Sequence, residues 1–430
     1  MMRRAALALW LASACRAAPP EPVVLNPDGA WCWFQDERAL IHGEKLWVGS
    51  IGAKGDVCVT TWDMKKGAAG VAVIHPRFEA DDHNAPALLL RNDGRLMAFY
   101  TTHGGPPGKR LLYVRTSARP YDASEWEPVE TFDAQVKDGF TYANPFQLPA
   151  ESNRIYFFWR ALGFHPTWTA SDDLGRTWLP GRNHILYQPG ERPYVKYASN
   201  GSDTIHCAFT DGHPNRPFRN NLYHAYYRKG GLYRSDGTFI RRLEEGPVKT
   251  TEASRVYDGS APTGEAWVWD MHLDRAGRPV IAYSSHPGPM DHRYRYARWN
   301  GRSWEDYQIG FAGRHLYKSQ EYYSGGICLD PDDVNVVYAS SNVDAATGRP
   351  AGGGRYEIWR GATTDRGKSW TWRKLTQDSA ADNLRPAVPA GHPGRTFVLW
   401  FRGRYTSYTN YQTEVAALTD ARLPAMARKP

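Results

Sequence analysis

The 430-residue chain lacks most of the features that mark helical, membrane-spanning or nucleic-acid-binding proteins. After its first residues, no apolar run approaches the roughly 20 consecutive residues that a membrane helix needs. Long stretches of Ala, Glu, Lys and Leu, which would favour helices, are scarce. A concentrated run of Lys or Arg is also absent, which argues against a nucleic acid as partner. These absences favour a chain without transmembrane segments that is built mainly from strands.

Cysteine is scarce as well, with five residues in the chain. Four of them lie inside strand-like apolar segments: Cys32, Cys58, Cys207 and Cys328. No pair has the spacing of a zinc ribbon, so we interpret these four as small buried hydrophobic residues. One disulfide remains an alternative if the protein works in an oxidising compartment.

The N-terminus has the pattern of a targeting segment. Arg3 and Arg4 precede an apolar run over residues 5–11, and small residues follow it. We therefore predict a signal peptide over residues 1–18 and export to the periplasm or the extracellular space. A lipoprotein signal, with the protein anchored through an acylated Cys15, is the alternative.

The charge balance is only weakly informative. The formal net charge of +8 falls to about +5 once Arg3, Arg4 and Arg16 leave with the signal peptide. A modest basic excess suits an acidic ligand such as a uronic-acid polymer, and it equally suits a solvated surface without a partner.

Glycine, proline and aromatic residues are abundant, with 40 Gly, 30 Pro and 13% aromatics, as expected for many short strands and turns. Residues 171–178 and 363–370 share the pattern Ser/Thr-x-Asp-x-Gly-x-Ser/Thr-Trp, which resembles the Asp-box of β-propeller blades. In this turn the Asp caps backbone amides, the Gly supplies a positive φ and the Trp packs between blades. We therefore interpret Asp173 and Asp365 as turn residues and not as catalytic acids.

Strand-like clusters recur seven times, at roughly 46–62, 87–126, 155–178, 205–233, 267–304, 327–370 and 396–417. This spacing predicts an all-β fold, a seven-bladed β-propeller that forms a single domain over residues 22–425. Six or eight blades are the alternatives. The segment around residues 22–34 is expected to add a strand to the last blade, since ring closure removes an exposed sheet edge.

Polar residues that interrupt apolar strand ends are the candidate site residues, because ligand sites of propellers form near the central axis. His83 precedes the strand at 87–90, and His103 ends the next strand. Tyr142 and Arg160 occupy parallel positions one blade later. A histidine suits proton transfer near neutral pH, and an arginine suits a carboxylate. For each of these residues the alternative is ordinary packing at a strand end.

A fourth segment is rich in tyrosine, histidine and asparagine, which suits a sugar-binding wall. It contains His213 and Tyr223 as candidate contacts. His213 and His224 are also candidates for a structural divalent metal, zinc or calcium, although their spacing is not diagnostic. We expect the protein to require no cofactor.

The chain resembles the BNR-repeat propeller family that contains ulvan lyases and related enzymes that release rhamnose from glucuronic acid. The resemblance spans nearly the whole mature chain and rests on six segments: Trp33–Ala39, Asp81–Pro86, the Asp-box at 171–178, Asp211–Pro214, Glu321–Gly326 and Asp382–Pro386. It implies histidines that hold or neutralise a uronate, a tyrosine that moves protons and an arginine that assists.

Carried onto this sequence, the resemblance implies four catalytic residues, namely His83, His103, Tyr142 and Arg160. The expected substrate-binding residues are Arg38, Asn84, Asn144, His213, Tyr223 and His42. In the rhamnose-releasing relatives a single histidine near the N-terminus carries the chemistry, and this points to His42.

We expect a polysaccharide lyase that cleaves a uronate-containing, ulvan-like polysaccharide by β-elimination. The expected partner is an acidic polysaccharide or oligosaccharide, and the expected oligomeric state is a monomer. A glycoside hydrolase of the same fold is the alternative, either an α-L-rhamnosidase or a sialidase, although the Arg-Ile-Pro motif of sialidases is absent. A propeller that binds carbohydrate without turnover is the third reading.

Overall fold

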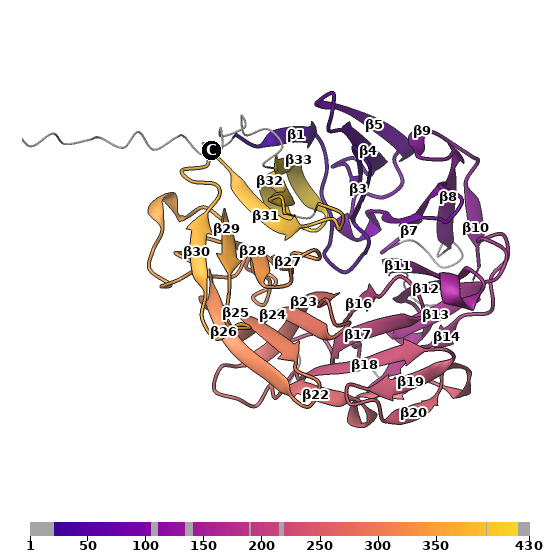
Figure 1. Cartoon of the computed structure of the whole chain (residues 1–430). Helices are drawn as coiled ribbons and strands as arrows, with labels where there is room; N and C mark the ends of the chain where they lie inside the picture. Colours follow the sequence, from indigo (N-terminus) through magenta and orange to yellow (C-terminus); the bar gives the residue numbers. More distant parts are fainter. Residues whose placement is uncertain are drawn as a thin grey trace, which may run out of the picture.

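The computed structural model describes residues 21–104, 111–133, 141–188, 191–214, 219–392 and 394–419. Over these residues the strands form seven antiparallel sheets that follow one another around a ring, each sheet being one blade (Figure 1). This confirms the predicted all-β, seven-bladed β-propeller. Among the same residues, no helix has the length and apolar character needed to cross a membrane. The predicted signal peptide and Cys15 lie outside the described residues.

Each blade is a meander whose first strand lies nearest the centre of the ring. The inner strands are β2 (Ala39–His42), β6 (Ala87–Leu90), β11 (Thr141–Leu148), β16 (Val195–Ser199), β23 (Glu265–Leu273), β27 (Ile327–Leu329) and β31 (Asp382–Ala387). The second strands are β3 (Lys45–Ile51), β7 (Leu96–Thr101), β12 (Arg154–Arg160), β17 (Thr204–Thr210), β24 (Pro279–Gly288), β28 (Val336–Ser341) and β32 (Phe397–Ser407). Most residues of these strands are buried, because neighbouring blades cover both faces of each sheet near the centre of the ring.

The third strands are β4 (Val57–Asp63), β8 (Leu112–Arg119), β13 (Pro166–Ser171), β18 (Leu222–Arg228), β25 (Asp291–Trp299), β29 (Glu357–Ala362) and β33 (Asn410–Thr419). The fourth strands are β5 (Ala68–His75), β10 (Glu130–Phe132), β14 (Arg182–Asn183), β19 (Gly231–Arg234), β26 (Trp304–Gly313), β30 (Thr371–Lys374) and β1 (Val23–Asn26).

Short additional elements decorate this plan. Strand β9 (Asp122–Trp126) pairs with β8, while β20 (Phe239–Arg242) and β22 (Ser254–Tyr257) enlarge the fourth blade. Strands β15 (Ile185–Leu186) and β21 (Val248–Lys249) form a small parallel pair. The 3₁₀ turns are η1 (Asp82–Asn84), η2 (Pro149–Glu151), η3 (Leu162–Phe164), η4 (Leu243–Glu245), η5 (Thr250–Glu252) and η6 (Gly352–Gly354).

The N-terminal strand closes the ring, as predicted. Strand β1 pairs with β33 in antiparallel register, with Val23 opposite Ala417, and the two lie side by side in Figure 1. The last blade therefore has strands from both ends of the chain. This pairing removes a free sheet edge from the blade that ends the chain.

The two Asp-boxes are hairpin turns in which the Asp caps the backbone, as predicted. Asp173 follows β13 and accepts hydrogen bonds from the Thr177 backbone N–H (2.9 Å) and hydroxyl (2.6 Å). These bonds hold the pKa of Asp173 down to about 2. Trp178 packs between blades against Phe99 and Phe157. The box at 363–370 repeats these bonds with Asp365 and Ser369.

Replacing this capping carboxylate tests its structural role. We expect Asp173→Ala to lower the free energy of unfolding by about 1 kcal/mol, the usual net value of a lost hydrogen-bonded cap, and to leave the polysaccharide cleavage expected from the sequence unchanged. Thermal unfolding and kcat measure the two effects. Asp172→Ala is the control, since it breaks only an exposed pair with Arg154, and a loss of kcat in Asp173→Ala with the fold intact would contradict this assignment.

A plug segment, residues 30–37, crosses the centre of the ring between β1 and β2. Its backbone and side chains contact several blades: Trp33 stacks on Trp269 at 4.0 Å between ring centroids, and its indole N–H donates to the Val268 carbonyl (3.1 Å). Lys196 donates to the Trp33 carbonyl at 2.6 Å. The plug segment fills the axis of the propeller, and its Phe34 packs against Tyr142 and Tyr194.

The four described cysteines are buried and unpaired. Cys32 lies in the plug segment, and the other three lie within strands of different blades. The sequence-based reading of these residues as small buried hydrophobes is confirmed.

Candidate active site

The face on which the inner strands begin carries an open pocket of about 350 Å³ above the plug segment. Its lining comprises cationic, aromatic and amide side chains: His83, His103, Tyr142, Arg160, Arg192, Tyr194, His213, Gln320, Tyr323 and Tyr408. The four predicted catalytic residues and the predicted substrate contact His213 therefore meet in one place. None of these described lining residues is Asp or Glu.

Blade geometry explains why distant residues meet at this face. His83 lies in η1 just before β6, and Tyr142 lies at the start of β11, so both stand where an inner strand begins. His103 follows the end of β7, Arg160 ends β12, and His213 follows β17. Because successive strands are antiparallel, the beginning of each inner strand lies beside the end of the second strand.

The two histidines share one carboxylate. His83 Nδ1 lies 2.6 Å from Asp81 Oδ1, and His103 Nδ1 lies 2.7 Å from Asp81 Oδ2. The two imidazole rings stack with centroids 4.1 Å apart. Since both Nδ1 atoms face Asp81, the Nε2 side of each ring is left for the pocket.

A second carboxylate supports His83 from below. Asp82 Oδ1 lies 3.1 Å from His83 Nδ1, and Asp82 Oδ2 accepts from Arg385 Nη1 (2.6 Å) and from the Tyr405 hydroxyl (2.5 Å). Arg385 also donates to the Trp31 carbonyl (2.6 Å). Asp82 and Arg385 are almost wholly buried, so this network ties the position of His83 to the last blade and to the plug segment.

These contacts give the two histidines different charge states. Burial alone would lower the pKa of His83, but the Asp81 carboxylate and its hydrogen bonds raise that pKa well above its ordinary value of 6.5. Burial and the neighbouring charge of His83 lower the pKa of His103. At neutral pH His83 is thus a cation, and His103 is a neutral ring whose Nδ1–H donates to Asp81, which leaves Nε2 as a proton acceptor.

Tyr142 is held in an uncommon backbone conformation. Its φ is 67°, in the left-handed region, at an irregularity in the pairing of β11 with β12. Asn144 Nδ2 donates to the Tyr142 carbonyl (2.7 Å) and to the Phe34 carbonyl (2.9 Å). Burial raises the pKa of the Tyr142 phenol well above 10, so it carries its proton at neutral pH. Such strained positions often mark functional sites.

Arg160 stacks beneath the tyrosines of the pocket. Its guanidinium carbon lies 4.7 Å from the centroid of the Tyr142 ring, and Nη1 donates to the Tyr194 hydroxyl (3.0 Å). Arg192 adds a second guanidinium at the rim, 4.1 Å from the Phe164 ring centroid. With His83 these side chains make the pocket cationic.

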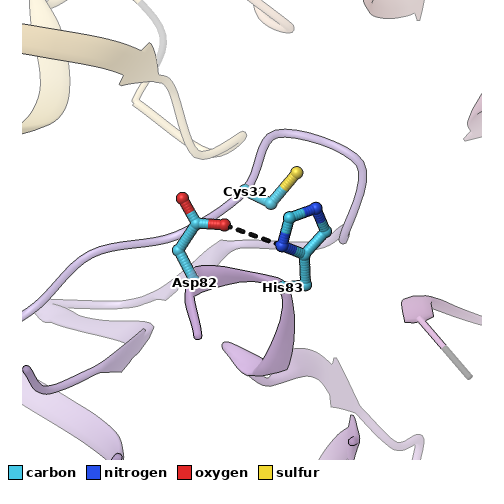
Figure 2. Close-up of side chains that lie close together, drawn as sticks. All are labelled: Cys32, Asp82 and His83. Carbon is cyan, nitrogen blue, oxygen red and sulfur yellow. Dashed lines mark ion pairs between the residues drawn. The ribbon is translucent and has the colours of Figure 1, made fainter. Parts of the chain in front are cut away.

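Among the residues that the structure describes, two groups of side chains are close enough to hold a metal ion. They are Cys32 with Asp82 and His83, which face one another in Figure 2, and Asp81 with His83 and His103. The carboxylates of both groups already have cationic partners, because Arg385 binds Asp82 and His83 binds Asp81. Neither group is the predicted pair, since His213 lines the pocket while His224 lies within β18 and bonds to His206 (3.0 Å).

Two predicted substrate contacts instead hold the scaffold. Arg38 is buried and donates to the Cys32 and Gln35 carbonyls (2.6 and 2.7 Å), so its charge is used to fix the plug segment. Asn84 is also buried and donates to the Glu79 carboxylate (2.7 Å). Neither residue lines the described pocket, so the structure does not bring either of them into the candidate site.

Three further predicted contacts lie elsewhere. Asn144 is buried beneath Tyr142, where it fixes the backbone. Tyr223 lies on β18 and stacks on Phe209. His42 ends β2 as an exposed residue stacked on Tyr121, with 4.3 Å between ring centroids, and does not line the pocket.

Several residues of the site were not predicted. Asp81, Asp82 and Arg385 lie in segments that carry the family resemblance, as does Tyr323, yet the sequence assigned them no role. Their sequence neighbourhood gave the available signal: charged groups placed beside apolar inner strands must be paired or used. Tyr194 had no comparable signal.

Comparisons with known proteins agree with this architecture. A curated relative, "Ulvan Lyase-PL25" of Pseudoalteromonas sp. (strain PLSV), is 23% identical over 348 residues, covering 70% of this chain and 68% of the relative. An ulvan lyase of Nonlabens ulvanivorans is 26% identical over 263 residues, covering 52% of this chain and 53% of the relative.

Among solved structures, a polysaccharide lyase PL25 ulvan lyase bound to -[GlcA(1-4)Rha3S]- has a TM-score of 0.64 and 17% identity, covering 92% of this chain and 95% of that one. At this identity the likeness shows a shared fold. The family model described as "BNR repeat-containing family member" matches residues 45–312, well over half of the chain. The chain belongs to the BNR repeat-containing family.

Proposed function

We propose that the protein is a polysaccharide lyase that cleaves a uronate-containing, ulvan-like polysaccharide by β-elimination. One observation carries the proposal: the pocket brings together His83, His103, Tyr142 and Arg160, and no carboxylate is among its described lining residues. A cationic pocket with proton-transfer groups suits an anionic sugar. The similarity to two ulvan lyases supports the same substrate class.

The substrate carboxylate is proposed to lie between Arg160 and His83. Removing the proton on the carbon next to a carboxylate places more negative charge on an existing anion. The guanidinium of Arg160 and the cationic imidazole of His83 disperse that charge, and in a partly buried pocket such stabilisation is large. His213 lines the same pocket and is a further substrate contact.

The charge states of the pocket residues support one assignment of the proton transfers. Neutral His103 accepts the proton from the carbon next to the carboxylate through Nε2. The bond from the neighbouring carbon to the glycosidic oxygen then breaks, a carbon–carbon double bond forms, and Tyr142 donates its phenolic proton to the leaving oxygen. The raised pKa of Tyr142 suits it to be the acid. Proton transfers of this kind contribute about 10² to 10⁴-fold each.

Hydrolysis by the usual pair of carboxylates has less support in this pocket. Such a mechanism needs an acid and a second carboxylate on opposite sides of the scissile bond. Asp81 and Asp82 both contact the lining residue His83, and both are paired with cationic side chains. We propose in addition that the enzyme is exported, acts as a monomer and needs no cofactor.

The reaction is tested by incubating the protein with ulvan, other uronate polymers and rhamnose-capped glucuronides. Ultraviolet absorbance of an unsaturated uronate is followed together with a reducing-end assay. The proposal expects both signals to rise in step on a uronate polymer. Reducing ends without absorbance would indicate a hydrolase, and absence of both with binding retained would indicate a carbohydrate-binding propeller.

The pH dependence follows from the two histidines. His103 must be neutral to accept a proton, and its pKa lies below 6.5. We therefore expect kcat/KM to rise as the pH increases through the pKa of His103. His83 must be protonated, and its pKa lies well above 6.5, so activity should fall only at clearly alkaline pH. Asp81→Asn should move the alkaline limb to lower pH, since it removes the charge that raises the pKa of His83. An unchanged alkaline limb in that variant would contradict the assignment.

A further inference from the structure

A second pocket, of about 220 Å³, opens beside the candidate active site between the fifth blade and the loop that leads into β27. The loop separates the two pockets: Gln320 and Tyr323 line the active-site pocket, while Glu321 and Tyr322 line the second. His213 of the first pocket is close enough to His286 of the second to lower its pKa. The two pockets are therefore neighbours across a single loop.

The polar groups of the second pocket come from neighbouring strands. Glu265 begins β23 and pairs directly with His286 of β24. Residues directly opposite in an antiparallel pair have their side chains on the same face of the sheet, so the two side chains stand together. Gly264 precedes Glu265 with a φ of 85°, and a Cβ there would lie 2.1 Å from the His286 carbonyl oxygen. A side chain at position 264 is therefore excluded, and the pocket next to Glu265 is bounded there by backbone alone.

One polar atom of each group is buried without a hydrogen-bond partner in the described part of the chain, while His286 Nε2 lies 3.3 Å from the Ser284 hydroxyl and Glu265 is half-buried. His286 is 7% exposed and its Nδ1 has no hydrogen-bond partner there. Glu265 Oε2 is likewise buried without a partner. Buried polar atoms normally have hydrogen bonds, so such a pair indicates groups kept for a ligand. Burial raises the pKa of Glu265 to about 7 and lowers that of His286 well below 6.5, which leaves the pair with little net charge.

An aromatic face and a cation complete the pocket. The Tyr322 ring lies 5.4 Å from the His286 ring, centroid to centroid, and is half-buried. Arg219 lies exposed at the rim. The weakly charged hydrogen-bonding pair suits two adjacent hydroxyl groups, and the aromatic ring suits a face of C–H groups. A sugar ring offers both.

We propose that the second pocket is a subsite that binds another sugar unit of the polysaccharide chain, through a pair of hydroxyl groups held by Glu265 and His286. Tyr322 packs against the ring of that sugar, and Arg219 lies near an acidic substituent. The proposal rests on the proposed lyase function and adds that binding depends on the length of the substrate chain. Chains long enough to cross the Gln320–Tyr323 loop gain affinity that the shortest cleavable substrate does not.

The test compares KM and kcat for purified oligosaccharides of increasing length from the cleaved polymer. Glu265→Ala should raise KM about tenfold for long substrates and leave KM for the shortest cleavable one unchanged, with kcat unaltered, since one or two hydrogen bonds are lost. Tyr322→Ala, in a loop, should act in the same direction. Glu130→Ala on the outer strand β10 is the matched control and should change neither constant.

Two results would overturn the subsite while the lyase function stands. One is an equal KM change at every length, or none at any length, in both Glu265→Ala and Tyr322→Ala. The other is calorimetric binding of calcium chloride or zinc chloride by the wild-type protein that Glu265→Ala abolishes, which would make the pocket a cation site. Failure of the wild-type protein to cleave any uronate polymer would overturn the lyase and the subsite together.

Discussion

Tyr142→Phe should lower kcat by about 10² to 10⁴-fold and leave the fold intact. The substitution removes one oxygen, the proposed proton donor to the leaving group. It keeps the ring that packs against Phe34 at 5.0 Å and against the Arg160 guanidinium. Steady-state kinetics on a uronate polymer measure the effect, and thermal unfolding checks the fold.

Tyr113→Phe is the matched control for this variant. Tyr113 stacks on Tyr100 with 5.6 Å between ring centroids and does not line the described pocket. We expect its kcat within about twofold of the wild type, as for substitutions away from the site. Retention of wild-type kcat by Tyr142→Phe would exclude Tyr142 as the acid.

Arg160→Gln should lower kcat/KM by about 10² to 10³-fold, the usual loss when one stabilising group of a developing oxyanion is removed. The guanidinium is buried and fixed by Tyr142 and Tyr194, so it is oriented before the substrate arrives. Arg160→Lys should recover only part of the loss, because an ammonium cannot make the planar, two-pronged contact with a carboxylate.

Arg154→Gln, at the opposite end of the same strand, is the control for Arg160→Gln. Arg154 makes an ion pair with the exposed Asp172 and lies away from the pocket. Its substitution should leave kcat/KM unchanged. An equal loss of kcat/KM in both variants would contradict this role. It would mean that Arg160 supports the structure of strand β12 and does not act through its charge in the pocket.

The fold could be predicted from the sequence because the patterns that define it each lie within a short stretch of the chain. Asp-boxes such as 171–178 define a turn within eight residues, and the recurrence of strand clusters sets the number of blades. Ring closure by β1 also follows from a general rule, since an open blade edge invites aggregation. The strand clusters still missed inner strands such as β11 and β16, in which polar residues such as Asn144 and Lys196 interrupt the apolar pattern.

The sequence predicted the candidate site only in part. A position at a strand end indicates where a residue lies in the blade, but it does not indicate which side chains contact that residue. His83, His103, Tyr142 and Arg160 were found by their positions at strand ends, and they line the pocket. Arg38 was expected to contact substrate because it lies in a segment that carries the family resemblance. In the fold, however, the plug segment presents backbone carbonyls to its guanidinium.

The contacts that set the charge states join distant parts of the chain, and this is why they were missed. Arg385 lies 303 residues after Asp82, yet it bonds to that carboxylate beneath His83. Such a pairing depends on the closed ring, which brings the last blade next to the first blade and to the η1 turn that carries Asp82. No spacing within the sequence indicates it.

Cleavage of a uronate polymer in water enriched in heavy oxygen, followed by mass spectrometry of the products, tests the central claim most directly. Elimination breaks the glycosidic bond without adding water, so the account predicts an unsaturated product that contains no heavy oxygen from the cleavage step. A saturated product that carries one heavy oxygen at each new reducing end would show hydrolysis and contradict the account.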